Sequence, residues 1–342
     1  MLRGVLASVL ASVFFGVLYL YPVLLQPMNA NQILAFRMLL TFPAVTLILL
    51  MTGRRWAIQR VLVLAGEKPL VGLSLLVTAG ILAMQMWLFA WAPLNGYALD
   101  TSLGYFLLPL VMVVIGRVLY QEPMSWWKIA GAALATIGVI HEVWRAGGMS
   151  WPTVAVAGGY AVYFVVRHQA GTSFSGGLWA EMALMLPIAA FLLGAEDGLT
   201  AIDDQSLLIA AILGLGALSA GALVAYTVAS KLLPFNVFGL LGYLEPVLLV
   251  FVSLAIGETL APGQIFTYLP IWLALGVLVV ESAVDIVRRR RSVTTPAEDY
   301  ESEREPVTAG IPIVDQPLAE MTAGSHPVTA GIPLVDRHER HD

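Results

Sequence analysis

Cysteine is absent from this chain of 342 residues. This excludes disulfide bonds, thiol nucleophiles and metal sites with cysteine ligands. Charged residues are also scarce, at 12% of the sequence, whereas soluble globular domains contain about 25%. The phosphate-binding pattern GxxxxGK[ST] and the zinc-binding pattern HExxH are both missing. We therefore assign no catalytic residue, cofactor, metal or nucleic-acid partner.

Apolar residues dominate instead, at 58% of the chain with a mean hydropathy of +0.82. Such a chain belongs in a lipid bilayer, where a spanning helix needs roughly 20 mostly apolar residues. No small-residue cleavage site closes the first apolar run, so we expect it to be retained as a span. The sequence predicts an all-α membrane protein with ten transmembrane helices, at residues 4–25, 33–52, 70–92, 99–119, 127–144, 152–169, 177–195, 206–229, 236–256 and 264–286.

Basic residues separate the two sides of these spans. If all ten are real, Arg3, Arg54, Arg55, Arg60, Lys68, Arg117, Lys128, Arg167, Lys231 and Arg288 to Arg291 share one side, and Arg145 lies opposite. The opposite side carries the acidic residues of 196–204. Because cytoplasmic loops retain Lys and Arg, both termini are predicted to be cytoplasmic, with the chain in the plasma membrane.

The chain repeats itself. LGY at 103–105, followed by Pro109 and Glu122, returns as LGY at 241–243, followed by Pro246 and Glu258. A weaker likeness links RMLLTFP at 37–43 with EMALMLP at 181–187. The first pair lies in the fourth and ninth spans and the second pair in the second and seventh. Each half then has five spans, and this odd number predicts that the second half is inverted, as in many secondary transporters.

This repeat sets the expected domains: a first five-helix unit at 1–145, an inverted second unit at 146–291 and a tail at 292–342. Glycine lets backbones approach closely, and proline frees a carbonyl and bends a helix. We therefore expect paired bends that line one central cavity, with ordinary packing glycines and proline kinks as the alternative. The residues of these bends are Gly104, Tyr105 and Pro109 in the first half, and Gly242, Tyr243 and Pro246 in the second.

The run WLFAWAPLNGYALDTSLGYFLLPLVMVVIGRVLYQEPMSWWKIAGAALATIGVI at 87–140, supported by YLEPVLLVFVSLAIGE at 243–258, resembles the EamA-type drug/metabolite transporters. The similarity is to their RarD, or chloramphenicol-sensitive-protein, branch. It covers about residues 4 to 286. The resemblance implies ten helices in two five-helix repeats and transport of small metabolites or drugs across the inner membrane.

Three ionisable residues within the spans are candidates for coupling or gating, because charged groups inside a membrane are costly and usually face a cavity. Glu245 lies between Tyr243 and the kink at Pro246, near the expected midplane. It is a candidate for proton exchange or for binding a substrate amine, or else a structural carboxyl. Arg37 is expected in an outer vestibule and Glu181 toward the cytoplasmic side, so the two are not expected to pair. Headgroup contact for Arg37 and a structural role for Glu181 remain open.

Aromatic and amide side chains gather around the third span. Gln85, Trp87, Trp91, Tyr97 and Asp100 suit a flat, partly apolar solute, since stacking and a few hydrogen bonds orient such ligands. Trp91 and Tyr97 also fit an interfacial aromatic belt. In the sixth span, Tyr160 and Tyr163 are further cavity candidates.

The tail is acidic, with ten Asp or Glu against three Arg. PVTAGIPIVD at 306–315 returns as PVTAGIPLVD at 327–336. Low hydrophobicity and frequent prolines predict disorder. The repeated segment is either a docking motif for a cytoplasmic protein or a product of replication slippage.

The sequence therefore predicts a secondary transporter that moves a small solute by alternating access among membrane lipids, with proton coupling through Glu245 as a further expectation. Two other classes stay open. One is a sensor or assembly protein that acts through the tail. The other is a membrane-embedded lipid-modifying enzyme, which would need a carboxylate or His/Arg cluster that the scattered acidic residues do not suggest.

Overall fold

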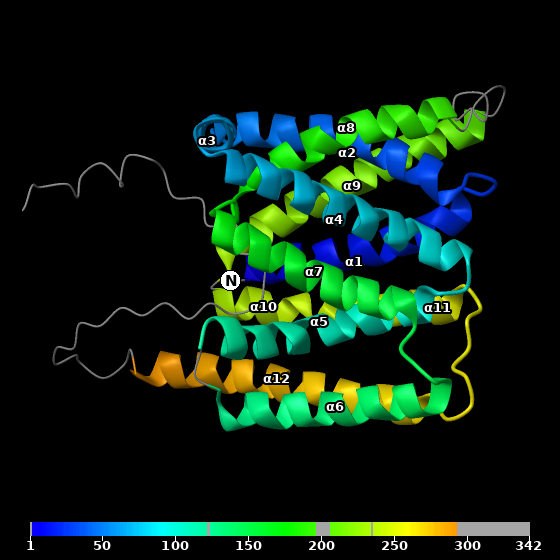
Figure 1. Cartoon of the computed structure of the whole chain (residues 1–342), viewed down its shortest axis with the longest axis vertical. Coiled ribbons are helices and arrows are strands. Elements are labelled where there is room, and N and C mark those ends of the chain that lie inside the picture. Colours follow the sequence, from blue (N-terminus) through cyan, green and yellow to red (C-terminus); the bar gives the residue numbers. More distant parts are fainter. Residues whose placement is uncertain (1, 122–123, 196–205, 234, 293–342) are drawn as a thin grey trace, which may run out of the picture.

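The computed structural model describes residues 2–121, 124–195, 206–233 and 235–292. These residues form helices and no strand. The helices are α1 (Leu2–Leu24), α2 (Ala30–Met51), α3 (Arg55–Glu67), α4 (Pro69–Leu94), α5 (Ala98–Leu119), α6 (Trp126–Ala146), α7 (Trp151–Ala170), α8 (Ser175–Ala195), α9 (Ser206–Leu232), α10 (Phe235–Gly242), α11 (Leu244–Ala255) and α12 (Ile265–Ser292). All except α3 run roughly side by side, and α3 is seen end-on (Figure 1).

Six of the described helices, α1, α2, α4, α5, α8 and α9, are long and apolar enough to cross a membrane. The helix α11 and the stretch Ile265–Glu281 of α12 are shorter apolar segments. This confirms a multi-pass, all-helical membrane protein in the described part of the chain. The count of ten spans and the inverted repeat stay predictions. Glu122, the acidic stretch at 196–204 and the repeated tail segments lie outside the described residues.

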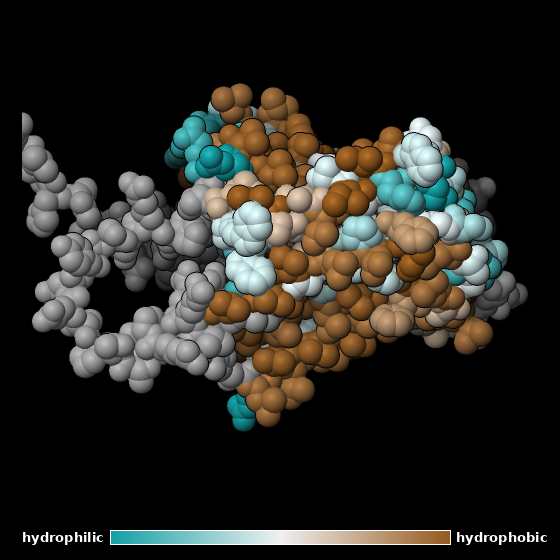
Figure 2. Space-filling view, turned by 90° about the horizontal axis from the view of Figure 1, so that it is seen from below, coloured by the Kyte–Doolittle hydropathy of each residue, from teal (hydrophilic) through white to brown (hydrophobic). Residues whose placement is uncertain are grey.

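Apolar side chains fill the interior of the bundle, and small polar ones are buried at some of the helix contacts. In α1, Ser8 and Ser12 are buried, whereas Leu6 and Leu10 are 59% and 46% exposed. In a bilayer, an outward-facing leucine contacts lipid hydrocarbon, which is as apolar as the protein interior. Membrane helices therefore associate through close packing, and small residues at their contacts are typical. Figure 2 shows one face on which apolar residues cover most of the middle and hydrophilic residues gather toward the ends.

Two features differ from the predicted spans. The predicted span at 236–256 is divided at Tyr243 into α10 and α11. The helix α3 was not predicted, because its 13 residues are too few to span a bilayer. It buries Ala57 and Val61 against the bundle and lies across the bundle's end (Figure 1).

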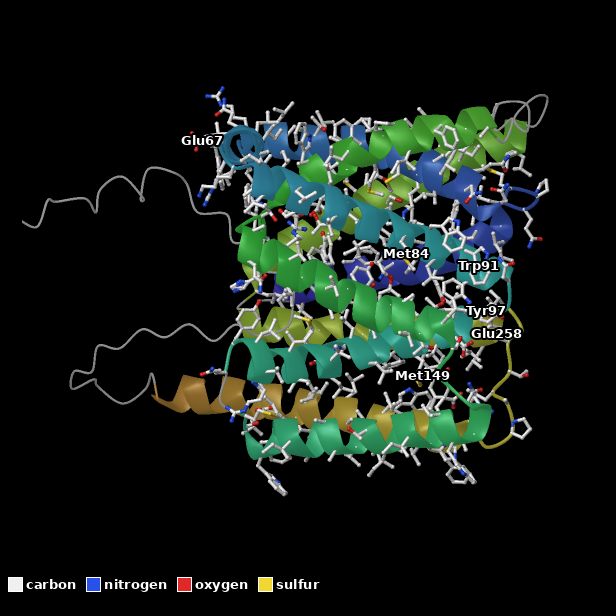
Figure 3. The ribbon with its side chains drawn as sticks, viewed as in Figure 1. Glu67, Met84, Trp91, Tyr97, Met149 and Glu258 are labelled. Atoms are coloured by element: carbon white, nitrogen blue, oxygen red, sulfur yellow. The ribbon has the colours of Figure 1, made fainter. Side chains whose placement is uncertain are left out.

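The N-terminus and the last turns of α12 lie at the same end of the bundle as α3, which we call the terminal end (Figure 1). The opposite end is the distal end, where Trp91, Tyr97 and Glu258 lie (Figure 3). Both described ends of the chain therefore share one side, as expected. That this side is cytoplasmic stays a prediction.

At the distal end, Glu258 follows α11 and caps the start of α5. Its two carboxylate oxygens accept hydrogen bonds from the backbone N–H groups of Ala98 and Leu99, each at 2.6 Å. Burial raises the pKa of this carboxyl, and the two N–H donors act against that rise. Since α5 and α11 belong to different predicted halves, this cap joins the two halves at the distal end.

Candidate functional site

A cavity of about 370 Å³ opens among α1, α2, α4, α5, α7, α8, α9 and the break between α10 and α11. It runs from Tyr105 and Glu245 in the middle of the bundle to Arg54 and Ser175, where α3 and α8 begin at the terminal end. Of the predicted site residues, those that line it are Arg37, Tyr105, Pro109, Tyr160, Tyr163, Gly242, Tyr243, Glu245 and Pro246. Gln85, Trp87, Gly104 and Glu181 are not among the lining residues.

Glu245 stands in the first turn of α11, directly after the break at Tyr243. Glu245 and Pro246 both line the cavity. No described residue forms a hydrogen bond or ion pair with this carboxylate. The positive charge of Arg37 acts on this carboxylate electrostatically, without direct contact.

Arg37 lines the same cavity from α2. The sequence placed it in an outer vestibule, yet here it shares the central cavity with Glu245. Its guanidinium lies 5.4 Å from the centre of the Phe89 ring, and its Nε is buried without a hydrogen bond in the described part of the chain. The two charged groups do not form an ion pair.

Two tyrosines complete this part of the cavity. The hydroxyls of Tyr105 on α5 and Tyr160 on α7 lie 3.4 Å apart, and their ring centres are 5.7 Å apart. Phe164 stacks on Tyr160 with 5.9 Å between ring centres. The wall near Arg37 and Glu245 therefore offers aromatic faces and two hydroxyl groups.

Glu181 is fully buried beside Arg167, which is 3% exposed. Arg167 approaches a Glu181 carboxylate oxygen at 3.3 Å, and Tyr163 donates a hydrogen bond to the same oxygen at 2.9 Å. Arg167 also donates to the backbone oxygens of Thr172 and Phe174, at 2.7 and 3.0 Å. Glu181 is thus paired directly with a basic side chain, whereas no described residue forms an ion pair with Glu245.

Arg167 was not predicted as part of a site. Its position indicates only a basic residue at a helix end. The left-handed Gly171 ends α7 and lets the chain turn back, so that its carbonyls meet the guanidinium. The spacing of Tyr163 and Arg167, four residues apart on one helix, was the signal that could have linked them.

The aromatic residues predicted around the third span pack on one another. Trp91 lies with its ring centre 5.4 Å from Trp87, 5.2 Å from Tyr97 and 5.1 Å from Trp151. Trp87 also donates a hydrogen bond to Asn31 at 2.8 Å. We call Trp87, Trp91, Tyr97 and Trp151 the aromatic cluster. It joins α4 to α7 at the distal end, away from the cavity.

Gln85 and Gly104 lie between helices. The Gln85 amide donates to the backbone oxygen of Ala155 at 2.7 Å, which links α4 to α7. A Cβ on Gly104 would lie 2.7 Å from Val156 Cβ, so this glycine allows α7 to approach α5. Gly242 has open space around it and stands at the break, whereas α5 continues through Pro109 as one helix. The two predicted bends thus differ in form.

The described residues contain no group of three or more His, Cys, Asp or Glu side chains able to hold a metal ion.

A profile of the EamA-like transporter family matches residues 2–141. An uncharacterized transporter of Pasteurella multocida is 38% identical over 291 residues, which cover 84% of this chain and 99% of that relative. The chain belongs to the EamA-like transporter family.

Among the relatives of this EamA-like chain are proteins named RarD. The chloramphenicol-sensitive protein RarD of Pseudomonas aeruginosa is 40% identical, over 80% of this chain and 92% of that relative. Protein RarD of Escherichia coli is 28% identical, over 82% and 95%. No solved structure matches the chain. The predicted resemblance to the RarD branch is confirmed, and the EamA-like chain is a membrane transporter of the drug/metabolite superfamily.

Proposed function

We propose that this EamA-like chain is a secondary transporter that moves a small organic solute by alternating access, with Glu245 as its central ionisable group. Glu245 exchanges a proton or holds a cationic group of the solute. The proposal rests on one observation. The carboxylate of Glu245 lines the cavity and forms no hydrogen bond or ion pair with any described residue.

The cost of this arrangement supports a functional role. An acidic residue at the centre of a spanning helix costs roughly 2.5–3.5 kcal/mol. Arg167 offsets that cost for Glu181 through a direct ion pair, whereas Glu245 has no such pair and only the more distant charge of Arg37 acts on it. A group kept there at such a cost is best explained by a proton or ligand that it binds during the transport cycle.

The one-sided cavity supports alternating access. Its lining reaches Arg54 and Ser175 at the terminal end, while the distal end holds the aromatic cluster and the Glu258 cap on α5. A cavity that reaches one side only is what one state of such a transporter requires. Opening the other side then requires the aromatic cluster to separate.

The test compares the extracellular and intracellular small molecules of cells that express wild type or Glu245→Gln at equal membrane abundance. A solute redistributed only by wild type supports the proposal. Equal redistribution by both proteins would keep the transporter and leave Glu245 a structural carboxyl. No difference from cells with an empty vector contradicts transport.

Proton coupling is tested with purified protein in liposomes. An imposed pH gradient is expected to drive uptake of the identified solute by wild type and not by Glu245→Gln. Uptake that ignores the gradient in both proteins would contradict coupling.

Removal of residues 293–342 separates the transporter from a sensor that acts through the tail. We expect the shortened chain to redistribute the same solute to within about twofold per molecule in the membrane, because every described residue that lines the cavity precedes residue 293. Loss of transport with unchanged abundance would favour the sensor.

A further inference from the structure

The outer surface of α3 carries both basic and apolar side chains at the terminal end of the bundle. We propose that this surface binds the anionic headgroups of phospholipids in the leaflet on the terminal side, with Leu62 and Val63 in the outer edge of the hydrocarbon. The lipid-bound helix then anchors this end of the bundle, to which the cavity reaches. The proposal does not depend on which solute is moved.

The first argument is the direction of α3. Its 13 residues are too few to cross a bilayer, and it runs across the ends of its neighbours (Figure 1). Ala57 and Val61 are fully buried and pack in one cluster with Phe174, so one side of the helix is fixed to the bundle. Because the spans run along the membrane normal, α3 lies parallel to the membrane surface, as interfacial helices do.

The second argument is the apolar part of the surface. Leu62 and Val63 are 58% and 54% exposed. Only Lys68 separates α3 from α4, and Leu70 and Leu73 at the start of α4 are 80% and 57% exposed. Since α4 is long and apolar enough to cross the membrane, its exposed leucines face lipid. The exposed apolar residues of α3 are thus followed directly by a lipid-facing segment, and the edge of the hydrocarbon accepts them better than water does.

The third argument is the charge of the same segment. Arg55 and Lys68 are exposed, and Arg60 is half-buried with its guanidinium 5.1 Å from the centre of the Phe174 ring. None of the three basic groups forms an ion pair with a described residue. Glu67 is the only acidic residue between positions 54 and 68. Basic groups beside a membrane attract anionic lipid, so the charge of α3 calls for an anionic partner.

A phospholipid leaflet satisfies both parts of the surface at once. A soluble phosphate ion would bind the basic groups but leave Leu62 and Val63 in water. The acidic tail at 292–342 also has a suitable charge, but it follows α12, whose last turns lie at the opposite edge of the terminal end from α3 (Figure 1). Lipid already surrounds the neighbouring α4, and we therefore assign the surface to lipid.

The test uses the full-length protein in liposomes. Because the chain contains no cysteine, Leu62→Cys provides a single thiol on α3, and Asn95→Cys, which is exposed at the distal end of α4, is the control. Each thiol carries the same fluorophore, and nitroxide-labelled phosphatidylglycerol or phosphatidylcholine is added as the quencher at equal mole fraction. At Leu62→Cys we expect phosphatidylglycerol to quench at least about threefold more than phosphatidylcholine. At Asn95→Cys the two lipids should quench alike.

Variants assign the lipid preference to the basic groups. In the Leu62→Cys protein, Arg55→Gln with Lys68→Gln should reduce the preference for phosphatidylglycerol to less than about 1.5-fold. Arg55→Lys with Lys68→Arg keeps both charges and should keep the preference. Arg3→Gln removes an exposed charge elsewhere at the terminal end and should also keep it. These side chains are exposed, so the substitutions are expected to leave the fold intact.

Four results would overturn the proposal. Equal quenching by both lipids at Leu62→Cys would reject the preference for anionic headgroups. Strong quenching by aqueous iodide with none by either lipid would place this face of α3 in water. Loss of the phosphatidylglycerol preference on addition of inorganic phosphate would indicate a site for a free anion. Lipid quenching that is absent from the full chain and appears only after removal of residues 293–342 would identify the tail as the occupant.

Discussion

At the scale of single residues, the buried charges fall into two kinds. Glu181 and Arg167 compensate each other within the protein, whereas Arg37 and Glu245 line the cavity without pairing. The sequence singled out Glu181, Glu245 and Arg37 from the cost of charge in a membrane. It could not show which of them was paired, because the pairing depends on the turn at Gly171.

Removing the partner of a buried charge tests this distinction. Arg167→Leu leaves Glu181 uncompensated, and we expect the free energy of unfolding to fall by about 3–5 kcal/mol. Arg167→Leu combined with Glu181→Leu should recover much of that loss, since no buried charge then remains. Thermal unfolding of the purified protein in detergent measures both.

Arg3, which is exposed near the N-terminus, provides the control. Arg3→Leu removes the same charge from the surface and is expected to change the free energy of unfolding by less than about 0.5 kcal/mol. An Arg167→Leu protein as stable as this control would show that the buried pair contributes nothing to stability.

At the scale of helices, length and hydropathy predicted most of the elements, and the runs at 4–25, 33–52 and 70–92 lie within or close to α1, α2 and α4. A bend was predicted at Gly242, Tyr243 and Pro246, but a complete break there and a continuous helix at Pro109 were not, because both prolines give the same local signal. Pro246 lies in the first turn of α11, where proline is tolerated, while Pro109 lies inside a continuous α5. Tertiary packing decides between these outcomes.

Gly104 tests the contact between α5 and α7. Gly104→Ala would place a Cβ 2.7 Å from Val156 Cβ and 2.8 Å from the Thr153 oxygen, so the helices must separate. Overpacking of this kind costs about 1–3 kcal/mol. We expect a lower thermal unfolding midpoint.

Gly80, inside α4, is the matched control, because nothing lies within 4 Å of a Cβ built there. Gly80→Ala should leave the midpoint unchanged or raise it, since alanine favours helix by up to about 1 kcal/mol over glycine. If both variants behave alike, the close approach of α5 and α7 at Gly104 is wrong.

At the scale of the whole molecule, composition alone predicted a membrane protein, and the repeated LGY and proline pattern predicted where a cavity lies. Nine of the predicted residues line one cavity, although they come from helices far apart in sequence. Sequence patterns could not predict that this cavity reaches only the terminal end. The reach of a cavity is set by contacts between residues far apart in sequence, such as Trp91 and Trp151, which lie 60 positions apart and pack together at the distal end.

Because the chain contains no cysteine, a single introduced thiol reports access to the cavity from each side of the membrane. Ser12→Cys lines the cavity, and Asn95→Cys, exposed at the end of α4, marks the distal side. In vesicles of known orientation, a membrane-impermeant thiol reagent should modify Ser12→Cys at least about tenfold faster from the terminal side. It should modify Asn95→Cys only from the distal side.

The aromatic cluster then provides the decisive comparison. If stacking among Trp87, Trp91 and Trp151 keeps the distal end closed, Trp91→Ala with Trp151→Ala removes ring contacts worth about 0.5–1.5 kcal/mol each. The distal-open state should become more populated by up to about tenfold, so Ser12→Cys should react faster from the distal side and more slowly from the terminal side. A rise on both sides would instead indicate a general loosening of the bundle, and no change would show that the cluster does not control access, because only a shift between two states moves the two rates in opposite directions.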